Sequence, residues 1–139
     1  MESPSFQIHP QLTQDCRSLG RFKVSHVLLH RNATLPWFIL VPETDQNDLL
    51  DLEPDLRNRI MDEASAVSDF IKTQLHYTKI NVAAIGNVVP QLHIHVVGRK
   101  PGDALWPNPI WGHLKTERSY STETLEKWTP QTREYLKLQ

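Results

Sequence analysis

Apolar and polar residues alternate most regularly between Val89 and Arg99. The apolar positions are Leu92, Ile94 and Val96, and the polar positions between them are Gln91, His93 and His95. Successive side chains of a β-strand point to opposite faces of a sheet. The alternation therefore predicts a strand that buries one apolar face and presents a row of polar side chains on the other.

Three further apolar segments predict the rest of the sheet. Residues 22–29 and 35–42 predict an antiparallel hairpin, and the asparagine-containing turn at residues 30–34 joins them. Residues 79–86 predict another strand, and a turn at Gly86–Asn87 leads directly into the histidine strand.

One long helix is predicted from Pro54 to about Leu75, because proline suits the first helical turn. A short helical turn at residues 48–52 precedes it. The apolar residues of the long helix recur at helical spacing and form one stripe: Leu56, Ile60, Ala64, Val67, Ile71 and Leu75. A helix with such a stripe covers a sheet, so we expect an α+β domain, with an antiparallel sheet of about five strands and one long helix packed on it.

The ends of the chain are less regular. Residues 1–20 show no period and are expected to form an N-terminal arm, and residues 113–139 a C-terminal helical tail of the single domain formed by residues 1–139. Within that tail, Ser121 is a good N-cap for a helix over residues 123–138 that Pro130 interrupts.

Composition narrows the classes of partner. The hydrophobic content of 39% suits one packed domain, and the net charge of −1 gives no basic excess for nucleic acid. No apolar run approaches the roughly 20 residues that cross a bilayer, and the first residues lack the features of a secretory signal. Cys16 is the only cysteine, so an internal disulfide is impossible and a cytoplasmic location is expected.

The polar face of the histidine strand is the candidate site. Side chains two residues apart on one face lie roughly 7 Å apart, so Gln91, His93 and His95 can converge on one small anionic group. Imidazole acts near neutral pH as a nucleophile, a base or a metal ligand. Covalent catalysis, a metal site, passive anion binding and a plain half-exposed strand therefore remain as alternatives.

A proline-rich segment follows the candidate site. Residues 100–112 contain Trp106 and Trp111, and the prolines around them exclude regular structure. These tryptophans either close over a ligand bound at His93, in the same subunit or its neighbour, or pack the C-terminal tail against the rest of the domain. We expect Trp106 to contact that ligand.

The segment from Gln91 to Val97 resembles the motif of the histidine triad (HIT) family, in which three histidines alternate with hydrophobic residues. Here glutamine replaces the first histidine. The resemblance covers roughly residues 20–112. It extends to the strand before the long helix and to further matching positions: Asn81, Gly86, Arg99 and Leu105-Trp106-Pro107.

The resemblance implies a function. HIT proteins are nucleotide hydrolases or transferases that act at the α-phosphate through a covalent nucleotidyl-histidine, without a cofactor, and usually as homodimers. By this resemblance His93 is the nucleophile, His95 contacts the phosphate, and Gln91 is a neutral hydrogen-bond donor near the phosphate or leaving group. Zinc is not expected, because glutamine is a poor ligand beside two histidines. The substrate is a nucleotide, a nucleoside phosphoramidate or a polyphosphate, and neither nucleic acid nor membrane is an expected partner.

The chain also departs from the family pattern. Trp37 and Asp45 stand where many members have further histidines, and nothing acidic stands near Arg31 or Asn32, where many members grip the ribose. Val88 replaces a hydroxyl residue near the phosphate. The further substrate-binding residues expected are Asn81, Asn87, Arg31 and Asn32. These departures keep a second interpretation open, in which the protein binds nucleotide or phosphate without catalysis.

Overall fold

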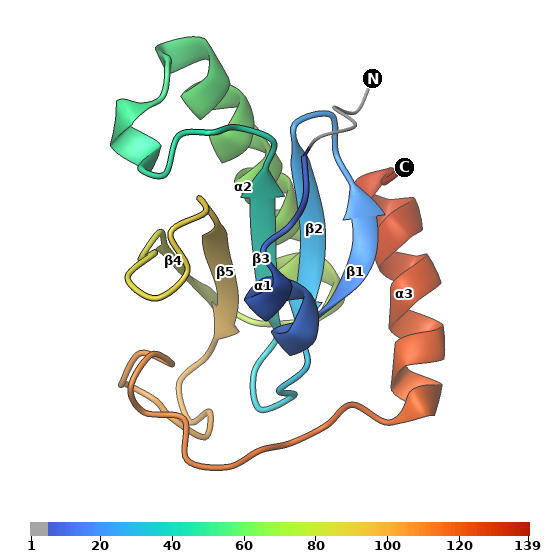
Figure 1. Ribbon diagram of the computed structural model, residues 1–139. Helices are drawn as coiled ribbons and strands as arrows, with labels where there is room; N and C mark the ends of the chain where they lie inside the picture. The colour runs from blue at the N-terminus through green and yellow to red at the C-terminus, as the bar shows by residue number, and fades with distance from the viewer. Residues whose placement is uncertain (1–5) are drawn as a thin grey trace.

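Five antiparallel strands form one sheet in the order β1-β2-β3-β5-β4 (Figure 1). The computed structural model describes residues 6–139, so residues 1–5, which begin the expected arm and include the terminus judged non-secretory, lie outside the described residues. The strands are β1 (Cys16–Arg21), β2 (Ser25–His30), β3 (Trp37–Pro42), β4 (Lys79–Ala83) and β5 (Ile94–Arg99). The predicted α+β fold with about five strands is confirmed.

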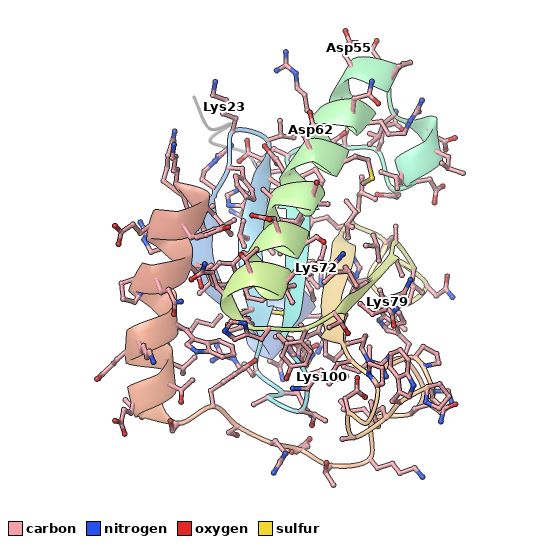
Figure 2. The ribbon with its side chains drawn as sticks, turned by 180° about the vertical axis from the view of Figure 1, so that it is seen from behind. Lys23, Asp55, Asp62, Lys72, Lys79 and Lys100 are labelled. Atoms are coloured by element: carbon pink, nitrogen blue, oxygen red, sulfur yellow. The ribbon has the colours of Figure 1, made fainter. Side chains whose placement is uncertain are left out.

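Helices lie on both faces of the sheet. The short α1 (Pro10–Asp15) lies on the front face in Figure 1, and the long α2 (Pro54–Gln74) crosses the back. Figure 2, seen from behind, shows α2 in front of the strands, with Lys72 near its C-terminal end and Lys79 at the start of β4. A 3-10 turn (η1, Leu49–Asp51) precedes α2, and α3 (Thr122–Leu136) runs beside β1.

The predicted helix boundaries agree with the structure at α2, which ends one residue before Leu75. Ile60, Ala64, Val67 and Ile71 of the predicted stripe are buried. Gly98 of β5 sits under this helix, where an added Cβ would lie 2.6 Å from Ile71 Cγ2. The close approach of helix and sheet therefore requires glycine at this position.

Several strand boundaries differ from the prediction. Strand β4 ends at Ala83 instead of continuing to residue 86, and β5 begins only at Ile94. The loop between them contains Gly86 with a φ of 66°, and Pro90, which has no backbone N–H to donate to a neighbouring strand. Gln91 consequently precedes the strand on which it was expected to lie.

The N-terminal segment is more ordered than an arm. It forms α1 and then β1, which pairs with β2 from Cys16 to Arg21. Only Cys16 and Leu19 of β1 are buried, so its sequence has no clear strand period. The strand is held by β2 on one side and by α3, where Arg133 donates to the Leu19 carbonyl at 2.9 Å.

The C-terminal helix begins where the sequence predicts. Ser121 is its N-cap, and the Ser121 hydroxyl accepts a hydrogen bond from the Thr124 amide at 3.1 Å. The interruption expected at Pro130 does not occur. Helix α3 continues through Pro130 and ends before Lys137. Among the helices of residues 6–139, none is long and apolar enough to cross a membrane.

Candidate active site

The two histidines of the motif lie together on the front face of the sheet. His95 pairs with Ile39 of β3, and His93 stands just before β5. Both side chains are buried, and their ring centroids lie 4.9 Å apart in an edge-to-face arrangement. The expected convergence of these two imidazoles is therefore present.

A cavity of about 340 Å³, called here the central cavity, opens over both imidazoles. Its aromatic lining comes from β2, β3, the residue before β5, β5 itself and the segment after β5: His30, Trp37, His93, His95 and Trp111. Its other lining residues come from α1, the start of β1, β3 and the loop after β4: Gln11, Leu12, Asp15, Cys16, Ile39, Ile85, Gly86, Asn87, Val88 and Val89.

Two larger cavities adjoin the central cavity. The C-terminal cavity, about 560 Å³, lies between residues 30–32 and 114–119 and shares Asp15 and His30 with the central cavity. The acidic cavity, about 520 Å³, lies against residues 47–51 and shares His93 with the central cavity. Ile85 and Gly86 also line both cavities, so His93 stands where the two cavities meet.

The protonation of His93 follows from its backbone contact. Its Nδ1 lies 2.7 Å from the carbonyl oxygen of Gln91. A carbonyl oxygen only accepts, so this Nδ1 carries a hydrogen, and in the neutral ring Nε2 then carries the lone pair. That arrangement suits a nucleophile or a base.

His95 has the opposite arrangement. The indole N–H of Trp37 donates to His95 Nδ1 at 2.9 Å, so in the neutral ring the proton sits on Nε2. Burial, with the neighbouring rings of His93 and His30, lowers the pKa of His95 to about 3. The ring is therefore a neutral hydrogen-bond donor near pH 7.

His30 supports this arrangement from β2. Its ring stacks on Trp37 with centroids 3.8 Å apart and planes within 3°. The backbone N–H of Asn32 donates to His30 Nδ1 at 3.0 Å. Burial also lowers the pKa of His30, which keeps this ring neutral beside the indole.

Gln91 does not line the central cavity. Its Oε1 accepts a hydrogen bond from the His9 amide at 2.8 Å, and its Nε2 donates to the Gln7 carbonyl at 2.9 Å. Both ends of the side-chain amide are thus bound to the segment that leads into α1. In this structure the glutamine holds a wall of the site and does not face the space over the imidazoles.

The predicted substrate-binding residues are distributed over several places. Asn87 lines the central cavity. Arg31 and Asn32 line the C-terminal cavity, where the side-chain amide of Asn32 donates to the Thr116 carbonyl at 3.0 Å. Asn81 accepts a hydrogen bond from Arg99, and the Trp106 ring lies over the Arg99 guanidinium at 5.7 Å. Neither Asn81 nor Trp106 lines the central cavity.

Several polar and aromatic residues that line the cavity were not predicted as site residues. Trp111 stands edge-on to His95 with ring centroids 5.3 Å apart, although Trp106 was the tryptophan predicted to contact the ligand. Gln11 and Asp15 come from α1, and His30 comes from the predicted turn. The available signal was Pro10, which occupies the first turn of α1 and marks a helix start.

Neither a reactive thiol nor a metal-binding group is found beside the imidazoles. Burial raises the pKa of Cys16 to about 12, which makes its thiol inert near neutral pH. Within residues 6–139, no group of three histidine, cysteine or acidic side chains stands close enough to hold a metal ion.

Comparisons with known proteins show the family to which the chain belongs. The HIT domain family matches residues 11–102. A histidine triad protein from Bradyrhizobium japonicum is 33% identical with a TM-score of 0.89, and the alignment covers 96% of this chain and 99% of that one. One from Marinobacter aquaeolei VT8 is 35% identical with a TM-score of 0.88, over 95% and 96% of the chains. One from Sinorhizobium meliloti 1021 is 30% identical with a TM-score of 0.88, over 94% and 97%. A comparison with functionally curated proteins gives no match.

Proposed function

Since the chain belongs to the histidine triad family, we propose that it is a nucleotide hydrolase or nucleotidyl transferase that uses His93 as its nucleophile. The observation that carries the proposal is the contact between His93 Nδ1 and the Gln91 carbonyl at 2.7 Å. This contact leaves the lone pair on Nε2, in a ring that borders two cavities. A neutral imidazole held in this way is a competent nucleophile near pH 7.

The reaction proceeds in two steps. His93 Nε2 attacks the α-phosphorus, a phosphorus–nitrogen bond forms, and the bond from phosphorus to the leaving group breaks. The leaving group departs with a proton taken from solvent. Water then attacks the nucleotidyl-histidine and releases a nucleoside monophosphate and free His93, or another acceptor takes the nucleotidyl group. Covalent catalysis divides one difficult step into two easier steps.

His95 stabilises the charge that develops on the phosphoryl oxygens. Its Nε2–H is a fixed donor near the nucleophile, because Nδ1 is occupied by the Trp37 indole. Donors positioned in advance lower the barrier without reorganisation during the reaction. The Asn87 side chain, which also lines the central cavity, supplies a further amide donor.

The two flanking cavities differ in charge, and this difference supports a choice of leaving group. The acidic cavity carries Asp48 and Asp51, and no lysine or arginine lines it. The C-terminal cavity carries Arg31, Lys115 and Arg118 together with two acidic side chains. An amine-bearing leaving group suits the acidic side better than a polyphosphate does, because like charges repel. We therefore place the nucleoside toward His30 and an amine toward Asp48, which makes a nucleoside phosphoramidate the preferred substrate.

Intact-mass spectrometry at neutral pH tests the proposal. The full chain is mixed with an adenosine phosphoramidate and sampled during turnover, and the expected result is an adduct with the mass of a nucleotidyl group. His93→Ala removes both the adduct and turnover. His113→Ala is the matched control, since His113 Nδ1 also contacts a carbonyl two residues earlier, at 3.1 Å, but lines none of the three cavities.

Three outcomes would contradict part of the proposal. Adduct formation that survives in His93→Ala assigns the nucleophile to another residue. Tight nucleotide binding without adduct or turnover in the unaltered protein supports the non-catalytic interpretation instead. Faster turnover of a diadenosine polyphosphate than of the phosphoramidate would contradict the choice of an amine leaving group.

We also propose that the protein is a homodimer that pairs through the β4 edge. Strand β4 ends the sheet, so one side of its backbone has no neighbouring strand in the described chain. Val82 on β4 is 52% exposed, and Ile85 just beyond it is 42% exposed. An unpaired strand edge with exposed apolar side chains is a typical pairing surface.

A further inference from the structure

We propose that Trp37 is a positioning residue that fixes His95 as a neutral imidazole with its proton on Nε2. This inference rests on the proposed function only for its catalytic consequence. The protonation of His95 itself stands on the geometry of three side chains that line the central cavity, Trp37, His95 and His30.

The contact between Trp37 and His95 comes from the register of two neighbouring strands. Trp37 of β3 pairs with Val97 of β5, which lies two residues after His95. Trp37 and His95 are therefore diagonal neighbours on one face of the sheet, within reach of a long aromatic side chain. The indole Nε1 lies 2.9 Å from His95 Nδ1, and both side chains are buried, at 8% and 7% exposed.

The chemistry of indole gives this contact only one direction. The tryptophan N–H donates and has no lone pair with which to accept. His95 Nδ1 must therefore be unprotonated, because an N–H there would point at another N–H. A neutral imidazole carries one hydrogen, and that hydrogen then sits on Nε2.

Trp37 is itself held in place from β2. The His30 ring lies flat against the indole at a centroid distance of 3.8 Å. The Asn32 amide donates to His30 Nδ1 at 3.0 Å, which fixes the plane of that ring. Rotation of the indole away from His95 would break the stack, so the backbone at Asn32 sets the orientation of Trp37 through His30.

The arrangement has a consequence for catalysis. If the proton of His95 moved to Nδ1, the lone pair of Nε2 would face the oxygens of a phosphoryl group bound at His93. A lone pair repels such an oxygen, whereas an N–H stabilises it. Trp37 therefore keeps His95 in the form that favours the transition state, and it does so without touching the substrate.

Nitrogen NMR of the uniformly ¹⁵N-labelled full chain tests the protonation without any substrate. The expected result is an acceptor-type Nδ1 and a protonated Nε2 in His95, with a ¹⁵N–¹⁵N coupling across the hydrogen bond from Trp37 Nε1. The unaltered protein shows this coupling, so the test does not depend on the folding of a variant. Absence of the coupling, or a proton on Nδ1, overturns the proposal.

Two matched tryptophan variants separate positioning from packing. Trp37→Phe keeps an aromatic ring for His30 and removes the N–H, so the His95 nitrogen signals should shift toward a mixture of both protonated forms. Trp111→Phe is the control, because Trp111 stands beside the same histidine and its Nε1 has no hydrogen-bond partner among the described residues. In that control the coupling and the His95 signals should persist.

Kinetics on the phosphoramidate give the functional readout. Trp37→Phe should lower kcat by about tenfold, less than the 10²–10³-fold loss typical when a transition-state donor is removed outright, and leave KM nearly unchanged. An unchanged kcat together with unchanged His95 signals would show that Trp37 only packs. If the unaltered protein turns over no nucleotide, the proposed function fails, while the NMR result still decides the role of Trp37.

Discussion

Arg99 and Asp103 form a buried two-point ion pair at the end of β5. Arg99 Nε donates to Asp103 Oδ2 at 2.8 Å, and Nη2 donates to Oδ1 at 3.1 Å. Arg99 is 1% exposed, and its third contact is the Asn81 oxygen at 3.0 Å. Burial alone would raise the pKa of Asp103, but its hydrogen bonds from Arg99 and two backbone amides lower that pKa to about 2. The pair fixes the start of the segment that carries Trp111 over the imidazoles.

Removal of one partner of this pair should be strongly destabilising. Asp103→Ala leaves the Arg99 guanidinium buried without its carboxylate, and such a change costs about 3–5 kcal/mol. Urea unfolding at pH 7 measures the loss. Glu126→Ala, an exposed acidic position on α3, is the control and should stay within about 0.5 kcal/mol of the unaltered protein. A loss below about 1 kcal/mol for Asp103→Ala would mean that Arg99 finds another partner or water.

Stability should fall as the pH falls from 7 to 5, in part because of His95. Its pKa is about 3 in the folded protein and 6.5 when unperturbed, so the unfolded chain binds more protons in this window and gains stability relative to the fold. The stabilisation from the low folded pKa is fully present above pH 6.5 and is lost toward pH 3. With an unfolded pKa of about 6.5, the loss between pH 7 and pH 5 is about 2 kcal/mol.

The matched comparison is His95→Gln, measured by urea unfolding at both pH values. The unaltered protein should lose about 2 kcal/mol more than this variant. The half-buried groups His30 and Glu63, whose pKa values are also shifted, titrate in both proteins, and their contributions largely cancel in the difference. Parallel pH profiles would show that folding does not lower the pKa of His95.

Gln91 should act on the N-terminal segment and only weakly on the chemistry. Gln91→Ala removes the acceptor of the His9 amide and the donor to the Gln7 carbonyl, each worth about 1 kcal/mol. Hydrogen exchange of the His9 amide should therefore quicken about tenfold, with turnover little changed. Unchanged exchange with a large fall in turnover would support the role near the phosphate, as would a higher rate for Gln91→His.

Trp111 should contribute to ligand affinity more than Trp106 does. Trp111 lines the central cavity, and replacing a stacking aromatic by alanine costs about 1–3 kcal/mol, so Trp111→Ala should weaken adenosine monophosphate binding about tenfold. Trp106→Ala is the comparison, because Trp106 lies over Arg99 outside that cavity. Calorimetric titration measures both. A larger loss in Trp106→Ala, at equal stability, would indicate that Trp106 reaches the site of the neighbouring subunit.

The proposed dimer should depend on the β4 edge. Val82→Lys places a charge on an exposed apolar position of the edge strand, and light scattering should then give a monomer mass at micromolar concentration. Leu50→Lys is the control, since Leu50 is 82% exposed but belongs to η1 and not to the edge strand. A dimer that persists in Val82→Lys would place the interface elsewhere.

The sequence by itself determined the elements whose side-chain pattern has a period. The stripe from Ile60 to Ile71 marked α2 within one residue of its end, and the alternation around His93 placed two imidazoles on one face. Period and face are properties of a single segment, so a single segment reveals them. Strand β1 was not predicted, because only two of its residues are buried and it is held by its neighbours β2 and α3.

Only the tertiary structure decided what surrounds the histidines. The hydrogen bond from Trp37 to His95 depends on the register of β3 against β5, and the stack of His30 on Trp37 depends on β2 lying beside β3. The amide of Gln91 turned to Gln7, 84 residues earlier, because a proline and a glycine end the strand before it. Contacts between segments far apart in the chain arise from sheet order and packing, which no local period encodes.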